Sequence, residues 1–164
     1  MRKILITGAT GLIGSHLMST FGNDDKVYAI SRDQSVPGAT KTLNLDLGKL
    51  WSRADMPKKV DIIVHLAQSE QYRDFPNSAE DVFKVNTLST VKLLDYARDI
   101  GVQQFVLASS GGIYGTGANS FSEDEAIIAK GELGFYIGTR LCSEMLSECY
   151  SSWMNVISLR FFFA

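Results

Sequence analysis

A glycine-rich segment close to the start of the chain has the residue types and spacing that bind phosphate. Gly8, Gly11 and Gly14 follow a short β-rich run at residues 3–7 and open an apolar helical pattern. Glycine permits a tight turn and a close approach of the main chain to a pyrophosphate, whose charge then lies at the helix N-terminus. The spacing is G-x-x-G-x-x-G, one residue longer in its first gap than the dinucleotide-binding fingerprint. The alternative is a glycine turn that binds no ligand.

The next strand-like run, residues 27–30, ends where the adenosine ribose of a dinucleotide would lie. An acid at this point would bind the ribose 2′-OH and favour NAD. The matching residue is Ser31, followed by Arg32, and a guanidinium matches the geometry of a phosphate. The pair therefore favours NADP over NAD. Asp33 stands close enough to favour NAD instead, and the alternative for Arg32 is a solvated loop charge.

Strand-like and helix-like patterns alternate along the chain. The strand-like runs are residues 3–7, 27–30, 42–45, 61–67, 104–108 and 156–162. Helical periodicity follows the glycine segment and covers residues 79–99 and 133–151, and Gly101 stands where a C′ glycine ends a helix. The nearly continuous apolar run at 61–67 is typical of a central parallel strand. The alternation predicts right-handed βαβ crossovers and a parallel sheet with helices on both faces.

Two loops and the last residues stand apart from this pattern. Segments 31–41 and 111–132 connect patterned elements, and the second is long enough to be a functional loop. Three consecutive phenylalanines at 161–163 precede the last residue, whereas a free terminus is usually polar and frayed. We therefore expect residues 1–164 to form one domain, the N-terminal part of a longer protein.

Motifs along the whole chain resemble those of the extended short-chain dehydrogenases/reductases, the group that includes sugar-nucleotide epimerases, dehydratases and reductases. The sequence TGATGLIGSHL resembles the family's TGxxGxxG opening. Further matches follow in the family's order: VHLA at 64–67, NTLST at 86–90, FVLASS with IYG at 105–115, Tyr136 of a Y-x-x-x-K site, and LRF at 159–161.

The resemblance implies a Rossmann fold, an α/β doubly wound parallel sheet of about six strands in the order 3-2-1-4-5-6. It implies that residues 1–164 are the NAD(P)-binding domain and that the C-terminal region that selects the sugar is absent from this chain. In relatives, two long helices form a four-helix dimer interface. The helices near 79–99 and 133–151 therefore predict a homodimer.

The resemblance also places the cofactor, NADP or NAD. The expected cofactor contacts are Gly8, Thr10, Gly11, Leu12, Ile13, Gly14, Ser31, Arg32, Asp46, Leu47, Leu66, Ala67, Gln68, Asn86, Ser109, Tyr136 and Arg140. Among them, Asp46 resembles the aspartate that contacts the adenine amino group, and its alternative role is a helix N-cap.

The family's catalytic tyrosine, basic residue and serine fall by resemblance on Tyr136, Arg140 and Ser110. Tyr136 and Arg140 are four residues apart, so they are neighbours on one helix face. The family has lysine where Arg140 stands. Arginine supplies a fixed cation that can grip the nicotinamide ribose, but it cannot give up a proton. Ser110 can hydrogen-bond the reacting sugar oxygen.

The two residues after this serine bear on the reaction. Family members that dehydrate sugars carry acidic residues there, whereas this chain has Gly111 and Gly112, which disfavours 4,6-dehydration. Epimerisation or reduction of a nucleotide sugar remains, in which Tyr136 removes a hydroxyl proton while hydride passes to nicotinamide. Because Arg140 replaces lysine, the alternative is a catalytically impaired NAD(P)-binding sensor or interaction module.

Composition and charge bound the other classes of function. A formal net charge of -2 gives no basic footprint for nucleic acid and no polybasic membrane patch. No stretch approaches the roughly 18 apolar residues that a membrane helix needs. Cys142 and Cys149 are interpreted as free buried thiols of a reducing compartment, which predicts the cytoplasm. His65 is interpreted as a core histidine, and no residue cluster has metal-ligand spacing.

Overall fold

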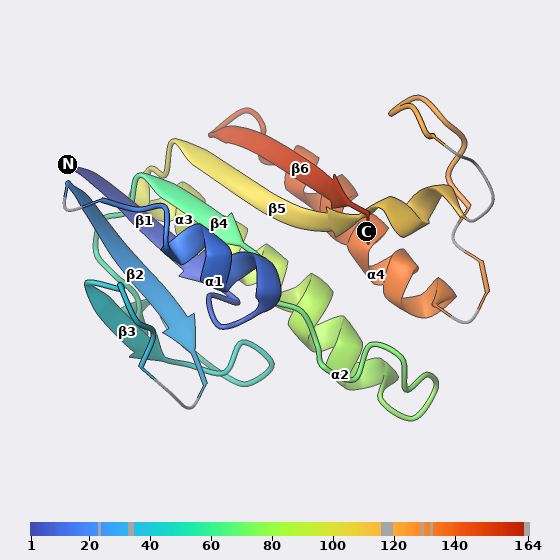
Figure 1. Cartoon of the computed structure of the whole chain (residues 1–164), viewed down its shortest axis with the longest axis horizontal. Coiled ribbons are helices and arrows are strands. Elements are labelled where there is room, and N and C mark those ends of the chain that lie inside the picture. The colour runs from blue at the N-terminus through green and yellow to red at the C-terminus, as the bar shows by residue number, and fades with distance from the viewer. Residues whose placement is uncertain (23, 33–34, 116–119, 129, 132, 163–164) are drawn as a thin grey trace.

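The computed structural model describes residues 1–22, 24–32, 35–115, 120–128, 130–131 and 133–162. Within these residues, six parallel strands form one sheet in the order β3-β2-β1-β4-β5-β6, which confirms the predicted topology (Figure 1). The strands are β1 (Arg2–Thr7), β2 (Asp25–Ser31), β3 (Lys41–Asn44), β4 (Ile62–His65), β5 (Gln104–Ser110) and β6 (Asn155–Phe161). Asp33 and parts of the 31–41 and 111–132 loops lie outside the described residues, as do residues 163–164.

The helices cover both faces of the sheet. Helix α1 lies over one face, and α3 and α4 lie over the other (Figure 1). The helical segments are α1 (Leu12–Met18), η1 (Arg53–Asp55), α2 (Ala79–Phe83), η2 (Lys84–Leu88), α3 (Ser89–Ile100), η3 (Gly111–Tyr114) and α4 (Gly134–Glu148).

Two apolar cores fill the space between the sheet and helices α1 and α3. Successive residues of a strand point to opposite faces. Ile4 and Ile6 of β1 accordingly pack with Met18 of α1 in one core, whereas Leu5 between them joins Leu93 of α3 in the other. The alternation explains why the central strands are apolar at nearly every position.

The helix predicted over residues 79–99 is interrupted. A π-helical turn, η2, separates α2 from α3. The spacing of the apolar residues along the helix therefore changes at this turn. Gly101 ends α3 in the left-handed conformation with φ of 71°, and the Val102 amide donates to the Ala97 carbonyl oxygen at 2.9 Å. The prediction of a C′ glycine is confirmed.

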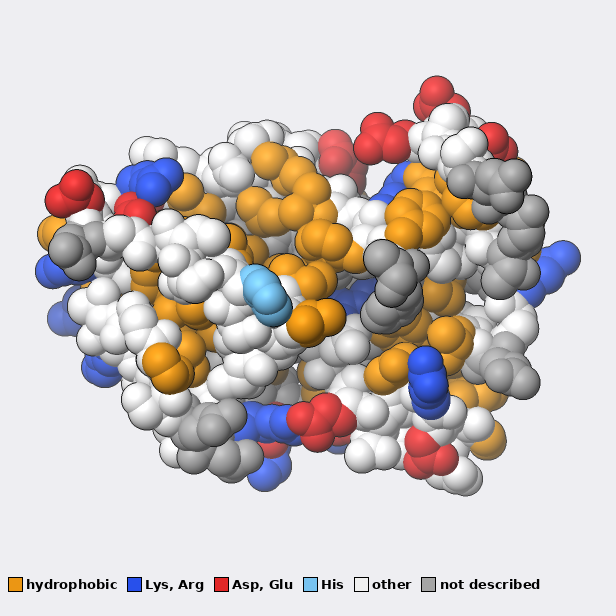
Figure 2. All heavy atoms as spheres, in the orientation of Figure 1, with side chains coloured by type: hydrophobic (Ala, Val, Ile, Leu, Met, Phe, Trp, Pro, Cys, Tyr) orange, Lys and Arg blue, Asp and Glu red, His pale blue; other side chains and the backbone are white. Residues whose placement is uncertain are grey.

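Both cysteines are free thiols, and the surface carries charges of both signs. Cys142 and Cys149 are both free, but Cys149 is exposed and Cys142 only partly buried, so the prediction of buried thiols is wrong. The helix predicted over residues 133–151 ends at Glu148, one residue before Cys149. Lys and Arg side chains are interspersed with Asp and Glu on the face drawn in Figure 2. Within the described residues, no helix combines the length and the apolar character that crossing a bilayer requires.

The sheet order reverses direction beside β1. Thr7 at the end of β1 pairs with Ile30 of β2 on one side and with His65 of β4 on the other. The chain leaves β1, β2 and β4 at the same edge of the sheet, so the segments that follow these strands meet there. In open α/β sheets, ligands bind at this kind of switch point.

Candidate active site

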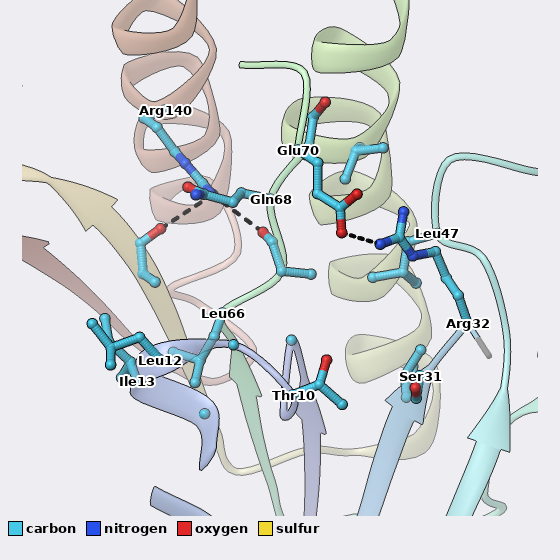
Figure 3. A pocket seen from close by; sticks show the side chains of 18 of the residues that line it. Thr10, Leu12, Ile13, Ser31, Arg32, Leu47, Leu66, Gln68, Glu70 and Arg140 are labelled. Atoms are coloured by element: carbon cyan, nitrogen blue, oxygen red, sulfur yellow. Dashed lines mark hydrogen bonds and ion pairs between the residues drawn. The ribbon is translucent and has the colours of Figure 1, made fainter. Parts of the chain in front are cut away.

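A cavity of about 510 Å³ opens at this switch point (Figure 3). Segments that follow β1, β2, β3, β4 and β5 line it, together with α4. The predicted contacts that line it are Gly8, Thr10, Gly11, Leu12, Ile13, Gly14, Ser31, Arg32, Asp46, Leu47, Leu66, Ala67, Gln68, Ser109, Ser110, Tyr136 and Arg140. Asn86 is not among the lining residues. Predicted residues that are spread over most of the chain therefore lie together in one cavity.

The glycine segment forms the floor of the cavity at the entrance to α1. Gly8 has φ of 70°, and a Cβ there would lie 2.7 Å from the amide nitrogen of Ala67. A Cβ on Gly14 would lie 2.2 Å from the carbonyl oxygen of Gly8. Side chains are thus excluded where β1, β4 and α1 approach each other. The first amides of α1 have no partner within the helix and are suited to an anionic ligand.

One end of the cavity is lined by the ends of β2 and β3. Ser31 is buried there, and the guanidinium of Arg32 makes an ion pair with the carboxylate of Glu70. Asp46 Oδ1 accepts a hydrogen bond from the Gly48 amide at 2.9 Å. Asp46 therefore closes a turn, and the alternative role of helix N-cap was wrong because no helix follows in this described segment.

The other end of the cavity holds the predicted catalytic side chains. Tyr136 and Arg140 are both buried on α4. The Tyr136 hydroxyl donates to Gln68 Oε1 at 3.1 Å, and Arg140 Nη2 donates to the same oxygen at 3.0 Å. Gln68 therefore links the phenol to the guanidinium. It approaches Arg140 from the segment after β4 (Figure 3).

Arg140 is held by the ends of two strands. Its Nη2 also donates to the Ala67 carbonyl oxygen at 3.4 Å, and its Nη1 donates to the Ala108 carbonyl oxygen at 3.3 Å. Its guanidinium lies 5.5 Å from the centroid of the Tyr136 ring, within the range of a cation–π contact. The cation is thus fixed between β4, β5 and the tyrosine.

Two polar atoms beside this cluster lack a hydrogen-bond partner. Among the described residues, four buried side-chain polar atoms are unpaired, and two of them, Ser109 Oγ and Arg140 Nε, belong to residues that line the cavity. Buried polar atoms normally have partners. Ser110 Oγ accepts a hydrogen bond from the Gly112 amide at 3.1 Å, so its own proton is available to another acceptor. Unpaired groups at this end and the glycine-rich entrance to α1 fit a dinucleotide that fills the cavity.

His65 lies behind the cavity in a directional chain of hydrogen bonds. Thr90 donates to the Asn86 carbonyl oxygen at 2.6 Å, so its hydroxyl oxygen accepts from His65 Nε2 at 3.0 Å. His65 Nδ1 then accepts from the Thr7 hydroxyl at 2.7 Å, and Thr7 Oγ1 accepts from the Ala67 amide at 3.1 Å. The neutral imidazole therefore connects the end of β1 to the segment after β4.

Burial decides the charge of this histidine. Desolvation, with a smaller contribution from the nearby Arg140 charge, lowers the pKa of His65 to about 3. The ring is fully buried, as the interpretation of a core histidine requires.

Asn86 lies behind the cavity and hydrogen-bonds both to the segment after β4 and to α4. Its Oδ1 accepts from the Ser69 amide at 2.9 Å, and its Nδ2 donates to Thr139 Oγ1 at 3.0 Å. Its carbonyl oxygen also accepts from the Ser143 hydroxyl at 3.0 Å. The fully buried amide thus holds the segment after β4 against α4, next to Arg140.

Sequence reasoning missed several lining residues on that same segment and on α2. The residues are Ser69, Glu70, Gln71 and Asp81. A signal for the first three was present, because they directly follow Leu66, Ala67 and Gln68 at the carboxyl end of a predicted central strand.

Fold and site together define a Rossmann-type domain with a dinucleotide-sized cavity at the switch point. The model of the NAD dependent epimerase/dehydratase family matches residues 4–163. The chain belongs to this family.

Individual relatives agree with this assignment. The chain is 31% identical, over 98% of its length and 56% of the relative's, to the uncharacterized UDP-glucose epimerase YtcB of Bacillus subtilis (strain 168). It is 29% identical to MoeE5, solved in complex with UDP-glucose and NAD, with a TM-score of 0.83, covering 98% of this chain and 54% of that one.

A third relative was also solved with NAD. It is a short-chain dehydrogenase/reductase superfamily protein from Agrobacterium tumefaciens, 26% identical with a TM-score of 0.83, and the match covers 98% of this chain and 49% of that one. The chain thus spans about half the length of the relatives it matches. NAD is the cofactor in these two solved relatives, so the expected preference for NADP finds no support from them.

Proposed function

We propose that this chain is the cofactor-binding domain of an NAD(P)-dependent enzyme that epimerises or reduces a nucleotide sugar. The observation that carries the proposal is the Tyr136–Gln68–Arg140 cluster, which shares one cavity with the glycine segment. The nucleotide-sugar class is supported by the complex of MoeE5 with UDP-glucose.

The glycine segment would hold the pyrophosphate, Asp46 and Leu47 the adenosine, and Ser109 and Arg140 the nicotinamide half. When bound, the nicotinamide would accept a hydride from a sugar carbon or deliver one to it. Arg140 Nε and Ser109 Oγ are buried without a hydrogen-bond partner, and both residues line the cavity at this end.

Side chains of this chain would carry out the proton transfer that accompanies hydride transfer. Tyr136 would exchange a proton with the sugar oxygen as hydride leaves or returns. Ser110 would donate its hydroxyl proton to the same oxygen, while one of its two lone pairs accepts from the Gly112 amide. Arg140 would orient Tyr136 and contribute positive charge, but it would not relay a proton.

Epimerisation or reduction is proposed in preference to 4,6-dehydration. Gly111 stands where dehydrating members carry an acid, and a Cβ at this position would lie 2.5 Å from the Phe162 ring. The aromatic ring fills the space that an acidic side chain would need.

A second candidate, a cofactor-binding module without turnover, is favoured by the contacts of Arg140. Its guanidinium is already bonded to the Ala67 and Ala108 carbonyl oxygens and to Gln68. In this alternative, the cavity still binds the dinucleotide, but Tyr136 exchanges no proton with a substrate.

Turnover measurements on the full-length protein separate the two candidates. UDP-glucose is the probe, with sugar configuration followed by NMR and nicotinamide reduction by absorbance. We expect Tyr136→Phe to lower turnover at least about 100-fold and Arg140→Lys to raise it. Tyr150→Phe is the matched control, because Tyr150 donates to Asp95 at 2.9 Å and does not line the cavity. If neither cavity variant changes the rate, the enzyme proposal fails.

A further inference from the structure

An ion pair joins two loops above the floor of the cavity. Arg32 follows β2 and Glu70 lies in the segment after β4, so the two residues come from opposite sides of β1. The guanidinium of Arg32 and the carboxylate of Glu70 face each other at the edge of the cavity (Figure 3). Both residues line the cavity, at the end where Ser31 and Asp46 lie.

Local hydrogen bonds fix the position of Glu70. The Ser69 amide donates to Asn86 Oδ1 at 2.9 Å, and the Ser69 hydroxyl donates to Asp81. The Gln71 amide in turn donates to Ser69 Oγ at 3.0 Å. The residues on both sides of Glu70 are therefore tied down, and the Glu70 side chain, which is 70% exposed, makes the ion pair with the Arg32 guanidinium.

Among the described residues, the charge at this end of the cavity is acidic on balance. Arg32 is opposed by Glu70, while Asp46 and Asp81 also line the cavity. Lys49 offsets Asp46, with their charged atoms 3.4 Å apart. A monoester phosphate carries about −1.5 to −2 charges at neutral pH. A phosphate on the adenosine ribose would therefore compete with Glu70 for Arg32 and be repelled by the other acids.

We propose that Glu70 determines which nicotinamide cofactor the cavity selects, by neutralising Arg32 and so favouring NAD over NADP. This inference rests on the proposed cofactor-binding function. The end of β2 carries Ser31 in place of the acid that favours NAD. Glu70 supplies that negative charge from the segment after β4 instead.

Dissociation constants for NAD and NADP, measured by calorimetry on the purified protein, test the proposal. In Glu70→Gln, we expect the ratio of the NADP constant to the NAD constant to fall about tenfold, because the carboxylate that competes with the phosphate for Arg32 is removed. Adding Arg32→Gln to this variant should restore the ratio. Glu80→Gln is the matched control, since Glu80 is an exposed carboxylate paired with Lys84 that does not line the cavity.

The outcomes separate this inference from the proposed function. Binding of NAD with a ratio that Glu70→Gln leaves unchanged overturns the role of Glu70 and leaves cofactor binding intact. A ratio that shifts in Asp33→Asn but not in Glu70→Gln also overturns it, because Asp33 then supplies the selecting charge. If the folded protein binds neither nucleotide, both proposals fail.

Discussion

The guanidinium carbon of Arg140 lies 5.5 Å from the centroid of the Tyr136 ring, one helical turn earlier on α4. A planar guanidinium can lie beside the ring and still donate in its own plane, here to the carbonyl oxygens of Ala67 after β4 and of Ala108 in β5. The structure therefore gives the arginine a role in holding two strands and a tyrosine together, beyond any role towards a ligand.

Arg140→Lys is expected to lower the free energy of unfolding by about 1–2 kcal/mol, because one ammonium cannot replace the whole guanidinium fork. Urea unfolding measures the change. Arg73→Lys is the control, since Arg73 is exposed and lies 5.3 Å from the Tyr72 ring centroid. Equal effects of the two substitutions would show that the strand carbonyls contribute nothing.

Gly14→Ala is expected to lower the free energy of unfolding by about 2–4 kcal/mol, because its Cβ would lie 2.2 Å from the Gly8 carbonyl oxygen. Gly138→Ala in α4, where a Cβ meets nothing within 4 Å, should instead stabilise the protein by about 0.5–1 kcal/mol. Thermal and urea unfolding of both variants provide the comparison. A Gly14→Ala protein as stable as wild type contradicts the close contact.

His65 makes stability depend on pH. Its pKa is lowered to about 3, so the unfolded chain binds the extra proton first as pH falls below the ordinary histidine value near 6.5. Its contribution is present above that value and is lost towards pH 3, and it amounts to about 2 kcal/mol between pH 7.5 and 5.

Urea unfolding at the two pH values measures this loss in wild type and in His65→Gln, where it should be smaller by that amount. His16→Gln, at an exposed position of α1, should behave as wild type. A direct check is the NMR signal of the His65 ring, which should not titrate between pH 7.5 and 5. Titration in that range would refute the assignment of a neutral buried imidazole.

The Asn86→Ala variant distinguishes two roles of Asn86. One is a direct contact with the cofactor, and the other is to hold the segment after β4 against α4. The substitution leaves the Ser69 amide and Thr139 hydroxyl without their partner, so we expect a loss of about 2–3 kcal/mol in unfolding free energy. Asn77→Ala, which removes one exposed hydrogen bond to Asp74, should cost far less. NAD affinity that falls about 100-fold or more while stability is unchanged would make Asn86 a direct contact.

Sequence periodicity and spacing anticipated the strands because buried parallel strands are nearly continuous apolar runs. The strand ends agree closely, as for the run predicted at 3–7 and the observed β1, Arg2–Thr7. The π turn at 84–88 was not predictable, since Val85 and Leu88 fit an ordinary helical face equally well.

Contacts between distant loops were also beyond the sequence. Arg32 and Glu70 are 38 positions apart, and nothing in either local pattern shows that their loops meet. The resemblance placed Asn86 near the cofactor, but its amide faces the protein interior because η2 and α4 pack against each other there. Gln68 was predicted to line the site, whereas its link between Tyr136 and Arg140 depends on how α4 packs beside the segment after β4.

A calorimetric titration of NAD and NADP into folded, purified protein tests cofactor binding most directly. The main-chain amides at the entrance to α1 and the unpaired Ser109 and Arg140 atoms predict saturable binding of a nicotinamide dinucleotide at one site per chain. Absence of heat with both nucleotides, at concentrations that saturate a relative of the same family, would contradict it.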